Sequence, residues 1–300
     1  MQGFLEGTFY LVDDNASGVG GTSLTLDAII EPNKSNVKLI STEDFSLKDC
    51  FSNVDVFIFG NLTNLTQNSL DAIKFTIENK PFVKIEFDYG YCKNRGRIPH
   101  EILSKEKCNC SKENTSVPHL KELYSLILKE SLHIFYMSEG QRSIHMDDLL
   151  FTNKKKTSVL SSCFCQAHLK KFKELKLKEK NEKYAIIDGN GGWHTQAKGV
   201  HKSIEYAEKN KIPFDLIKTN SYDDMIELLS NYKGLITMPI IHDTCPRITI
   251  EARYMGLEVI TNEKSQHITE DWWKKTDEIA YKFTKSRPFY FWEKLKCLKY

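Results

Sequence analysis

Short apolar runs alternate with amphipathic stretches along the first half of the chain. Five runs have the length and composition of buried strands: Thr8–Val12, Val37–Ile40, Val54–Phe59, Phe82–Phe87 and Leu132–Tyr136. Between them, apolar residues at helical spacing predict helices over Thr22–Ile30, Ser69–Asn79 and Leu120–Glu130. Strands that alternate with helices in this way predict an α/β fold with a parallel, doubly wound sheet.

A second α/β unit follows a strongly charged segment. Residues 166–183 are rich in lysine and poor in aromatic residues, which predicts an exposed interdomain linker, helical in part. Beyond it we expect strands at Tyr184–Ile187, Phe214–Ile217, Gly234–Met238 and Glu258–Thr261, and helices at Lys198–Lys209, Tyr222–Leu229 and Pro246–Met255. The aromatic tail from Thr269 to Tyr300 is expected to be helical. The predicted organisation is therefore a domain over 1–165, a linker over 166–183, a domain over 184–268 and C-terminal helices over 269–300.

Two acids near the C-terminal end of this second unit carry the main chemical signal. Asp243 and Glu251 lie eight positions apart, on either side of the predicted start of a helix at Pro246. Proline suits a first helical turn, and Gly256 is placed to end the helix. Backbone N–H groups at a helix N-terminus bind anions, and flanking carboxylates can hold sugar hydroxyls.

A glycine-rich loop precedes these acids by about 50 residues. Asn190, Gly191 and Gly192 give its backbone the freedom to wrap a phosphate, and Lys198 with Gly199 follows at the start of a helix. A lysine there can neutralise the charge that develops on a departing nucleoside diphosphate. The alternative is that Lys198 is simply a solvated lysine at the start of a helix.

The loop, the Lys198-Gly199 pair and the acidic pair occur in an order that resembles retaining, nucleotide-sugar-dependent glycosyltransferases of the GT-B architecture, family 4 and relatives. Their signature is E-x7-E, and Glu251, Ala252 and Gly256 fit it, whereas Asp243 replaces the first glutamate. The family's loop arginine is missing, and we expect Arg247 to replace it in part. The match covers residues 184–262 well and residues 8–30 loosely; residues 90–180 are unmatched.

This resemblance implies two Rossmann-like domains that face each other across a cleft, with C-terminal helices crossing back to the N-terminal domain. It implies a UDP- or GDP-sugar donor, retention of anomeric configuration and no required metal cofactor. Asp243 would orient the transferred sugar, Glu251 would bind the ribose, and Lys198 with Arg247 would hold the diphosphate. The expected donor-binding set is Gly20, Gly21, Asn190, Gly191, Gly192, Lys198, Thr244, Cys245, Pro246, Arg247 and Glu251.

The acceptor is expected at the first domain. Glu86, Asp88 and Tyr89 follow a predicted strand, and residues at the carboxyl ends of strands in open α/β sheets line ligand crevices. These side chains suit sugar hydroxyls; the alternative is a capped turn. Gly20 and Gly21 follow the first strand and mark either a ligand-binding loop or a tight turn. His100 and His194 are optional catalytic candidates, more typical of structural histidines.

Cysteines and histidines in the middle of the chain suggest a metal. Cys92, Cys108 and Cys110, with His100 or His119 nearby, are candidate Zn²⁺ ligands, and Cys163 and Cys165 could add to them. The spacing is not that of a standard zinc finger. Free thiols are the first alternative, and a local disulfide in an oxidising compartment is the second.

Composition excludes several classes of protein. The 42 basic and 40 acidic residues argue against binding nucleic acid through bulk charge. No apolar run approaches a membrane span, and the start of the chain lacks a signal-peptide pattern, which predicts a cytoplasmic protein. Trp272 and Trp273 with flanking lysines allow a peripheral membrane contact, since related enzymes often use lipid-linked acceptors.

The expected partners are a nucleotide-sugar and a glycan or lipid-linked acceptor. Two alternatives stay open: a nucleotide-sugar epimerase on the same fold, and a binding subunit that keeps the fold without catalysis.

Overall fold

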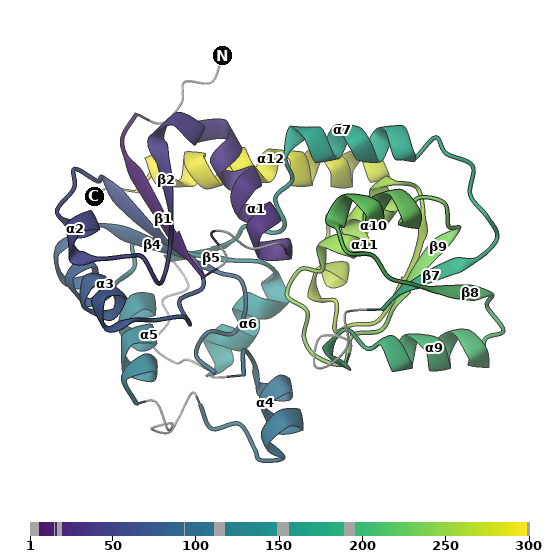
Figure 1. Ribbon diagram of the computed structural model, residues 1–300, viewed down its shortest axis with the longest axis horizontal. Coiled ribbons are helices and arrows are strands. Elements are labelled where there is room, and N and C mark those ends of the chain that lie inside the picture. The colour runs from purple at the N-terminus through teal and green to yellow at the C-terminus, as the bar shows by residue number, and fades with distance from the viewer. Residues whose placement is uncertain are drawn as a thin grey trace. The chain divides into compact units, whose positions relative to one another are not determined.

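The computed structural model describes residues 6–14, 16, 20–92, 94–110, 118–148, 156–188 and 196–298. The chain forms two compact units, which are treated separately here (Figure 1). Unit 1 comprises Met1–Cys163 together with Ser286–Tyr300, and unit 2 comprises Phe164–Lys285. The last stretch of the chain therefore belongs to the same unit as the first.

Unit 1 contains a six-stranded parallel sheet in the order β2-β1-β3-β4-β5-β6. Its strands are β1 (Phe9–Asp13), β2 (Val37–Ser41), β3 (Val56–Phe59), β4 (Phe82–Glu86), β5 (Ile134–Tyr136) and β6 (Thr157–Val159). Its helices are α1 (Gly21–Ile30), η1 (Glu31–Asn36), α2 (Leu47–Cys50), α3 (Gln67–Asn79), α4 (Arg97–Ser104), α5 (Pro118–Glu130) and α6 (Glu139–Asp148). The four residues of β3 are all buried, as expected for a central parallel strand covered on both faces.

The two faces of this sheet have different covers. On one face, Phe57 and Phe59 of β3 pack in a single core cluster with residues of α3 and α5. The other face receives the end of α12 (Asp277–Lys296). There the Trp292 indole lies 5.0 Å from the Phe9 ring and donates a hydrogen bond to the Ile29 carbonyl oxygen. Arg287 also donates to the carbonyl oxygens of Val159 and Leu160. The expected return of the C-terminal helix to the N-terminal domain is thus confirmed.

Unit 2 contains a four-stranded parallel sheet in the order β10-β9-β7-β8. Its strands are β7 (Tyr184–Ile187), β8 (Phe214–Ile217), β9 (Gly234–Thr237) and β10 (Glu258–Thr261), and its helices are α7 (Gln166–Leu175), α9 (Val200–Lys209), α10 (Tyr222–Leu229), α11 (Arg247–Tyr254) and η3 (Gln266–Thr269). Helix α9 lies on one face of the sheet, whereas α10 and α11 lie on the other (Figure 1).

Two segments differ from the expectations drawn from the sequence. Residues 166–183 were expected to form an exposed linker that is helical in part. They do begin with a helix, α7, but its Leu169, Phe172 and Leu175 are buried within unit 2. Its lysines occupy the solvent face of an amphipathic helix. The tail is not helical from Thr269, because α12 begins only at Asp277. Trp272 is instead buried in a turn, stacked 4.9 Å from Phe283.

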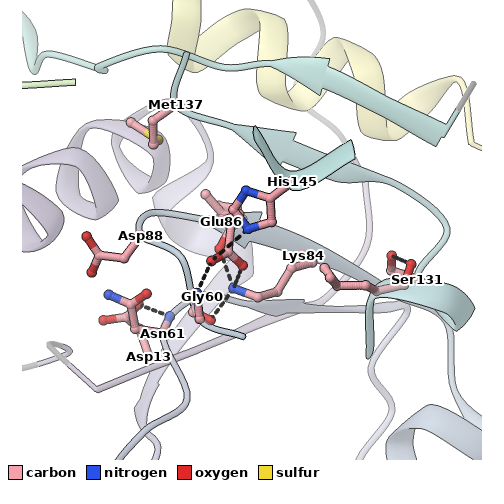
Figure 2. A network of polar contacts seen from close by, with 12 residues as sticks. Asp13, Gly60, Asn61, Lys84, Glu86, Asp88, Ser131, Met137 and His145 are labelled. Atoms are coloured by element: carbon pink, nitrogen blue, oxygen red, sulfur yellow. Dashed lines mark hydrogen bonds and ion pairs between the residues drawn. The ribbon is translucent and has the colours of Figure 1, made fainter. Parts of the chain in front are cut away.

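An ion pair is buried beside the end of β4 in unit 1 (Figure 2). Lys84 and Glu86 are two positions apart and so lie on the same face of the strand. The Lys84 ammonium lies 3.1 Å from Glu86 Oε2 and donates to the carbonyl oxygens of Gly60 and Ile85. Glu86 Oε1 accepts from the Gly90 N–H at 2.8 Å and lies 3.7 Å from His145 Nε2.

The environment of Glu86 keeps this carboxyl ionised. Burial would raise its pKa, but the Lys84 ammonium and the His145 ring outweigh burial and lower the pKa from 4.5 to about 2. Only 3% of the Lys84 side chain and 1% of the Glu86 side chain are exposed, so neither charge has water as an alternative partner. The pair is therefore a fixed feature of the core.

One glycine determines how α9 approaches the sheet. Gly199 precedes α9 with φ +68°, a left-handed conformation that favours glycine. A Cβ at this position would lie 1.7 Å from the Met238 carbonyl oxygen, just beyond β9. Close packing against the backbone at Met238 therefore explains why glycine follows Lys198.

We predict that Gly199→Ala destabilises unit 2 by more than about 2 kcal/mol, because the backbone strain adds to a clash with main-chain atoms. Urea unfolding of the full chain measures the loss. Gly20→Ala is the matched control, since nothing lies within 4 Å of a Cβ there and its φ of 171° is extended. Equal stability of the two variants would contradict the prediction.

We predict that Lys84→Met and Glu86→Gln each destabilise unit 1 by about 3–5 kcal/mol, because each leaves a charge or polar group buried without its partner. The double variant should lose clearly less than the sum of the two single losses. Calorimetric unfolding of all four proteins gives the coupling energy. Additive losses would show that the pair has no special coupling.

The pH dependence of the same proteins tests the sign of the pKa shift. A folded-state pKa of about 2 against an ordinary 4.5 means that ionised Glu86 stabilises the fold above about pH 4.5. This contribution is lost as the pH falls through about 2. Between these values the wild type should lose stability more steeply than Glu86→Gln, and a parallel decline would oppose the assignment.

Candidate functional site

The carboxyl edge of the unit 2 sheet has the topology of a ligand site. Strand β7 lies between β8 and β9, so the chain leaves β7 towards one side and later returns to the other. Ligands of open α/β sheets bind at such a switch point, outside the carboxyl ends of the two strands. Lys198 follows β7 and Asp243 follows β9, so the two predicted site residues flank this point.

Lys198 and Asp243 form an ion pair across the switch point. Two hydrogen bonds hold the backbone of Asp243. Its N–H donates to the Lys264 carbonyl oxygen at 2.8 Å, and its carbonyl oxygen accepts from Gln266 N–H at 3.0 Å. The Lys198 side chain is 57% exposed, whereas that of Asp243 is 13% exposed. A partly exposed ion pair of this kind contributes little to stability, because water competes for both charges.

The second acid of the predicted pair lies deeper. Glu251 of α11 is buried, and its Oε1 accepts a hydrogen bond from the Tyr222 hydroxyl at 2.8 Å and lies 3.4 Å from Arg247 Nε. Burial raises the pKa of Glu251, and the Arg247 guanidinium opposes this rise. The Arg247 guanidinium is itself buried, 4.1 Å above the Phe164 ring. The structure thus joins Arg247 to Glu251 as one buried group.

The remaining predicted donor residues are found in several places. Thr244 and Cys245 are buried directly before α11, and Pro246 is its N-cap. Gly20 and Gly21 begin α1 in unit 1. The predicted loop residues Asn190, Gly191 and Gly192, and the optional candidate His194, lie outside the described residues.

Unit 1 has a small pocket of about 20 Å³, partly open to solvent, at the carboxyl edge of its own sheet. Glu86 and Asp88, two of the three predicted acceptor residues, line it together with Lys84, Gly90 and Arg95. The third, Tyr89, is buried with its ring stacked 5.1 Å from His145. Tyr89 therefore does not line the pocket; its ring packs against His145, which lies beside Glu86.

Arg95 organises the mouth of this pocket. Its guanidinium lies 3.1 Å from Asp88 Oδ2 and donates to the Thr63 hydroxyl at 3.2 Å. Asp14, at the end of β1, accepts from the Thr63 and Asn64 N–H groups and lies 3.8 Å from Arg95. Carboxylate and guanidinium groups thus meet where the loops after three strands converge. The sequence analysis did not single out Arg95 as a site residue.

Gln141 is a second residue that the sequence analysis missed. Its side-chain amide donates to the carbonyl oxygens of Glu86 and Asp88, and its Oε1 accepts from Met137 N–H at 2.7 Å. It therefore joins the end of β4 to the end of β5. The signal was present as the S-x-x-Q pattern of Ser138 and Gln141, typical of a helix N-terminus.

The predicted metal ligands Cys92, Cys108 and Cys110 come together with His100 in unit 1, with ligand atoms all within 4.8 Å of one another. His100, an optional catalytic candidate, belongs to this cluster. Among the described residues, Cys163 and Cys165 are not part of it, and the side chain of His119 lies outside the described residues.

Of the two tryptophans expected to contact a membrane, Trp272 is buried and therefore not available for that contact. Trp272 is buried against His267 and Phe283, and the Trp273 ring lies 4.8 Å from the Arg253 guanidinium. Within the described part of the chain, no helix combines the length and apolar character of a membrane span.

Solved structures share this fold, although no protein-family model and no curated protein sequence matches the chain. The chain resembles the Anabaena protein HepE, solved with UDP and glucose, at 12% identity and a TM-score of 0.55 over 97% of this chain and 100% of HepE. An alpha-glucosyltransferase solved with UDP and a 13-mer DNA gives 10% identity and 0.50 over 96% and 90%. UDP-GlcNAc 2-epimerase from Methanocaldococcus jannaschii gives 11% identity and 0.50 over 96% and 99%. These likenesses confirm the predicted α/β fold with two parallel-sheet domains.

Proposed function

We propose that this protein is a glycosyltransferase that binds a UDP-sugar at the carboxyl edge of the unit 2 sheet. The observation that carries the proposal is the convergence of Lys198 and Asp243 from the two strands that flank the switch point. The lysine supplies a mobile cation for a diphosphate, and the acid supplies an acceptor for sugar hydroxyls. A UDP-sugar carries both the diphosphate and the sugar hydroxyls.

The chemistry assigns different tasks to the two acids. When the bond between the sugar and the diphosphate breaks, negative charge grows on the diphosphate, and Lys198 stabilises it by leaving Asp243. Asp243 then accepts hydrogen bonds from the transferred sugar. We assign Glu251 to ribose binding. Without ligand, its Oε1 accepts a hydrogen bond from the Tyr222 hydroxyl. Arg247 neutralises Glu251 and adds positive potential at the start of α11.

We assign the acceptor to the unit 1 pocket, where the partly exposed Asp88 can accept hydrogen bonds from hydroxyl groups and the buried Glu86, paired with Lys84, fixes the lining. A glycan or a lipid-linked sugar carries such hydroxyl groups. The resemblance to retaining enzymes supports transfer with retention, in which the departing phosphate takes the acceptor proton. No dedicated base or metal ion is then needed for transfer. The fold shared with proteins solved with UDP and glucose supports UDP as the nucleotide.

We predict that UDP raises the melting temperature of the wild type by a few degrees, because a ligand that binds only the folded state stabilises it. Lys198→Ala should abolish the shift. Lys202→Ala is the matched control, since Lys202 is an exposed lysine of α9, four residues after Lys198, and pairs with Glu205. ADP, GDP and CMP are measured in parallel. The absence of a shift with every nucleotide, or an unchanged shift in Lys198→Ala, would oppose the donor site.

We predict that Asp243→Asn lowers the rate of sugar transfer from UDP-glucose about 100-fold while the UDP-induced shift remains, since Asp243 contacts the sugar and not the nucleotide. Transfer to water is the simplest assay, with UDP release as the readout. Proton NMR of the first glucose released should show the α anomer, as in the donor. The β anomer would exclude retention, and a C2 epimer would identify the epimerase alternative instead.

A further inference from the structure

We propose that Cys92, His100, Cys108 and Cys110 bind a structural Zn²⁺ ion in unit 1. Four ligand atoms from one short stretch of chain lie within 4.8 Å of one another. All three cysteines are free thiols in this structure. The site is independent of the proposed sugar chemistry.

The separations between ligand atoms match a tetrahedral zinc site. Cys92 Sγ lies 3.7 Å from Cys108 Sγ and 3.4 Å from His100 Nδ1, and Cys110 Sγ lies 3.3 Å from His100 Nδ1. Zn–S bonds of about 2.3 Å and Zn–N bonds of about 2.0 Å at tetrahedral angles place two sulfurs about 3.8 Å apart, and a sulfur and a nitrogen about 3.5 Å apart. Binding therefore needs only small adjustments of the side chains.

Local backbone geometry brings these ligands together. Cys92 lies in a turn after β4, in which its N–H donates to the Tyr89 carbonyl oxygen and its carbonyl oxygen accepts from Arg95 N–H. Gly96, with φ +145°, then allows α4 to begin and to carry His100 back towards Cys92. A left-handed Lys105 ends α4 and returns the chain to Cys108 and Cys110. Cys92, Cys110 and His100 are buried, and Cys108 is half-buried.

The segment has a physical need for such a cross-link. Helix α4 has eight residues and exposes Ile102 and Leu103 by 42% and 51%, so it buries little apolar surface. Small elements without an adequate core are commonly held by a metal or by disulfides. Three sulfurs and one nitrogen leave no open coordination position, which is typical of structural zinc and not of catalytic zinc.

Zinc at this position would also hold the pocket of unit 1. The turn that carries Cys92 lies between Asp88, Gly90 and Arg95, all of which line that pocket. The metal would fix these residues without contacting the ligand. The metal would hold these residues in place whether or not the pocket accepts a sugar.

The first test is the metal content of the purified full-length chain, measured by plasma mass spectrometry. We expect about one zinc per chain in the wild type and less than about a tenth of that in Cys92→Ser and Cys110→Ser. Cys297→Ser is the matched control, because Cys297 is exposed and distant in sequence from the cluster; it should retain the metal. The proposal would be overturned if the wild type, produced in zinc-supplemented medium, contained no zinc after purification. It would also be overturned if the Cys92→Ser and Cys110→Ser variants retained the metal.

A second pair of variants covers the case in which the serine variants fail to fold. His100→Cys preserves a four-ligand tetrahedral set and should keep the metal, whereas His100→Ala should lose it. Cobalt substitution of the wild-type protein then reports the ligands directly. Absorption bands of a tetrahedral Co²⁺–thiolate site support the assignment, and an octahedral cobalt spectrum without thiolate charge transfer would refute it.

Discussion

Parallel strands all end at the same edge of their sheet, and this constraint decides where polar chemistry gathers in both units. In unit 2 it brings Lys198 and Asp243 together from the loops after β7 and β9. In unit 1 it brings Asp14, Thr63 and Arg95 together from the loops after β1, β3 and β4. The apolar runs that form the strands therefore determine the position of charged residues that they do not contain. Each half of the chain presents one such edge.

The two edges hold their charges in opposite ways. The Lys198–Asp243 pair is partly exposed, so water and ions compete for each of its charges. The Lys84–Glu86 pair is buried, with further hydrogen bonds to the backbone and the His145 ring beside the carboxylate, so it keeps one arrangement. An exchangeable pair suits a site where charge develops during a reaction. A fixed pair suits a surface that has to keep its shape.

The sequence predicted the alternation of strands and helices well, because buried parallel strands are short apolar runs with clear ends. It also singled out Lys198 and Asp243, which the structure brings together, and Glu251, which the structure pairs with Arg247. It failed where one kind of signal hid another. The lysines of residues 166–183 concealed Leu169, Phe172 and Leu175, whose spacing is that of an amphipathic helix. The contacts of Lys84 with Gly60, of Arg95 with Thr63 and of Gln141 with Glu86 join segments far apart in the sequence, so local patterns do not predict them.

The return of α12 to unit 1 has a consequence for the order in which the protein is made. Unit 2 is inserted between two parts of unit 1, so a ribosome delivers all of unit 2 before Arg287 and Trp292. Until then β1, α1 and β6 lack the side chains that cover Phe9 and bond the backbone at Val159. The half of the protein that is synthesised first is therefore completed last, and its apolar face stays uncovered while the inserted unit emerges.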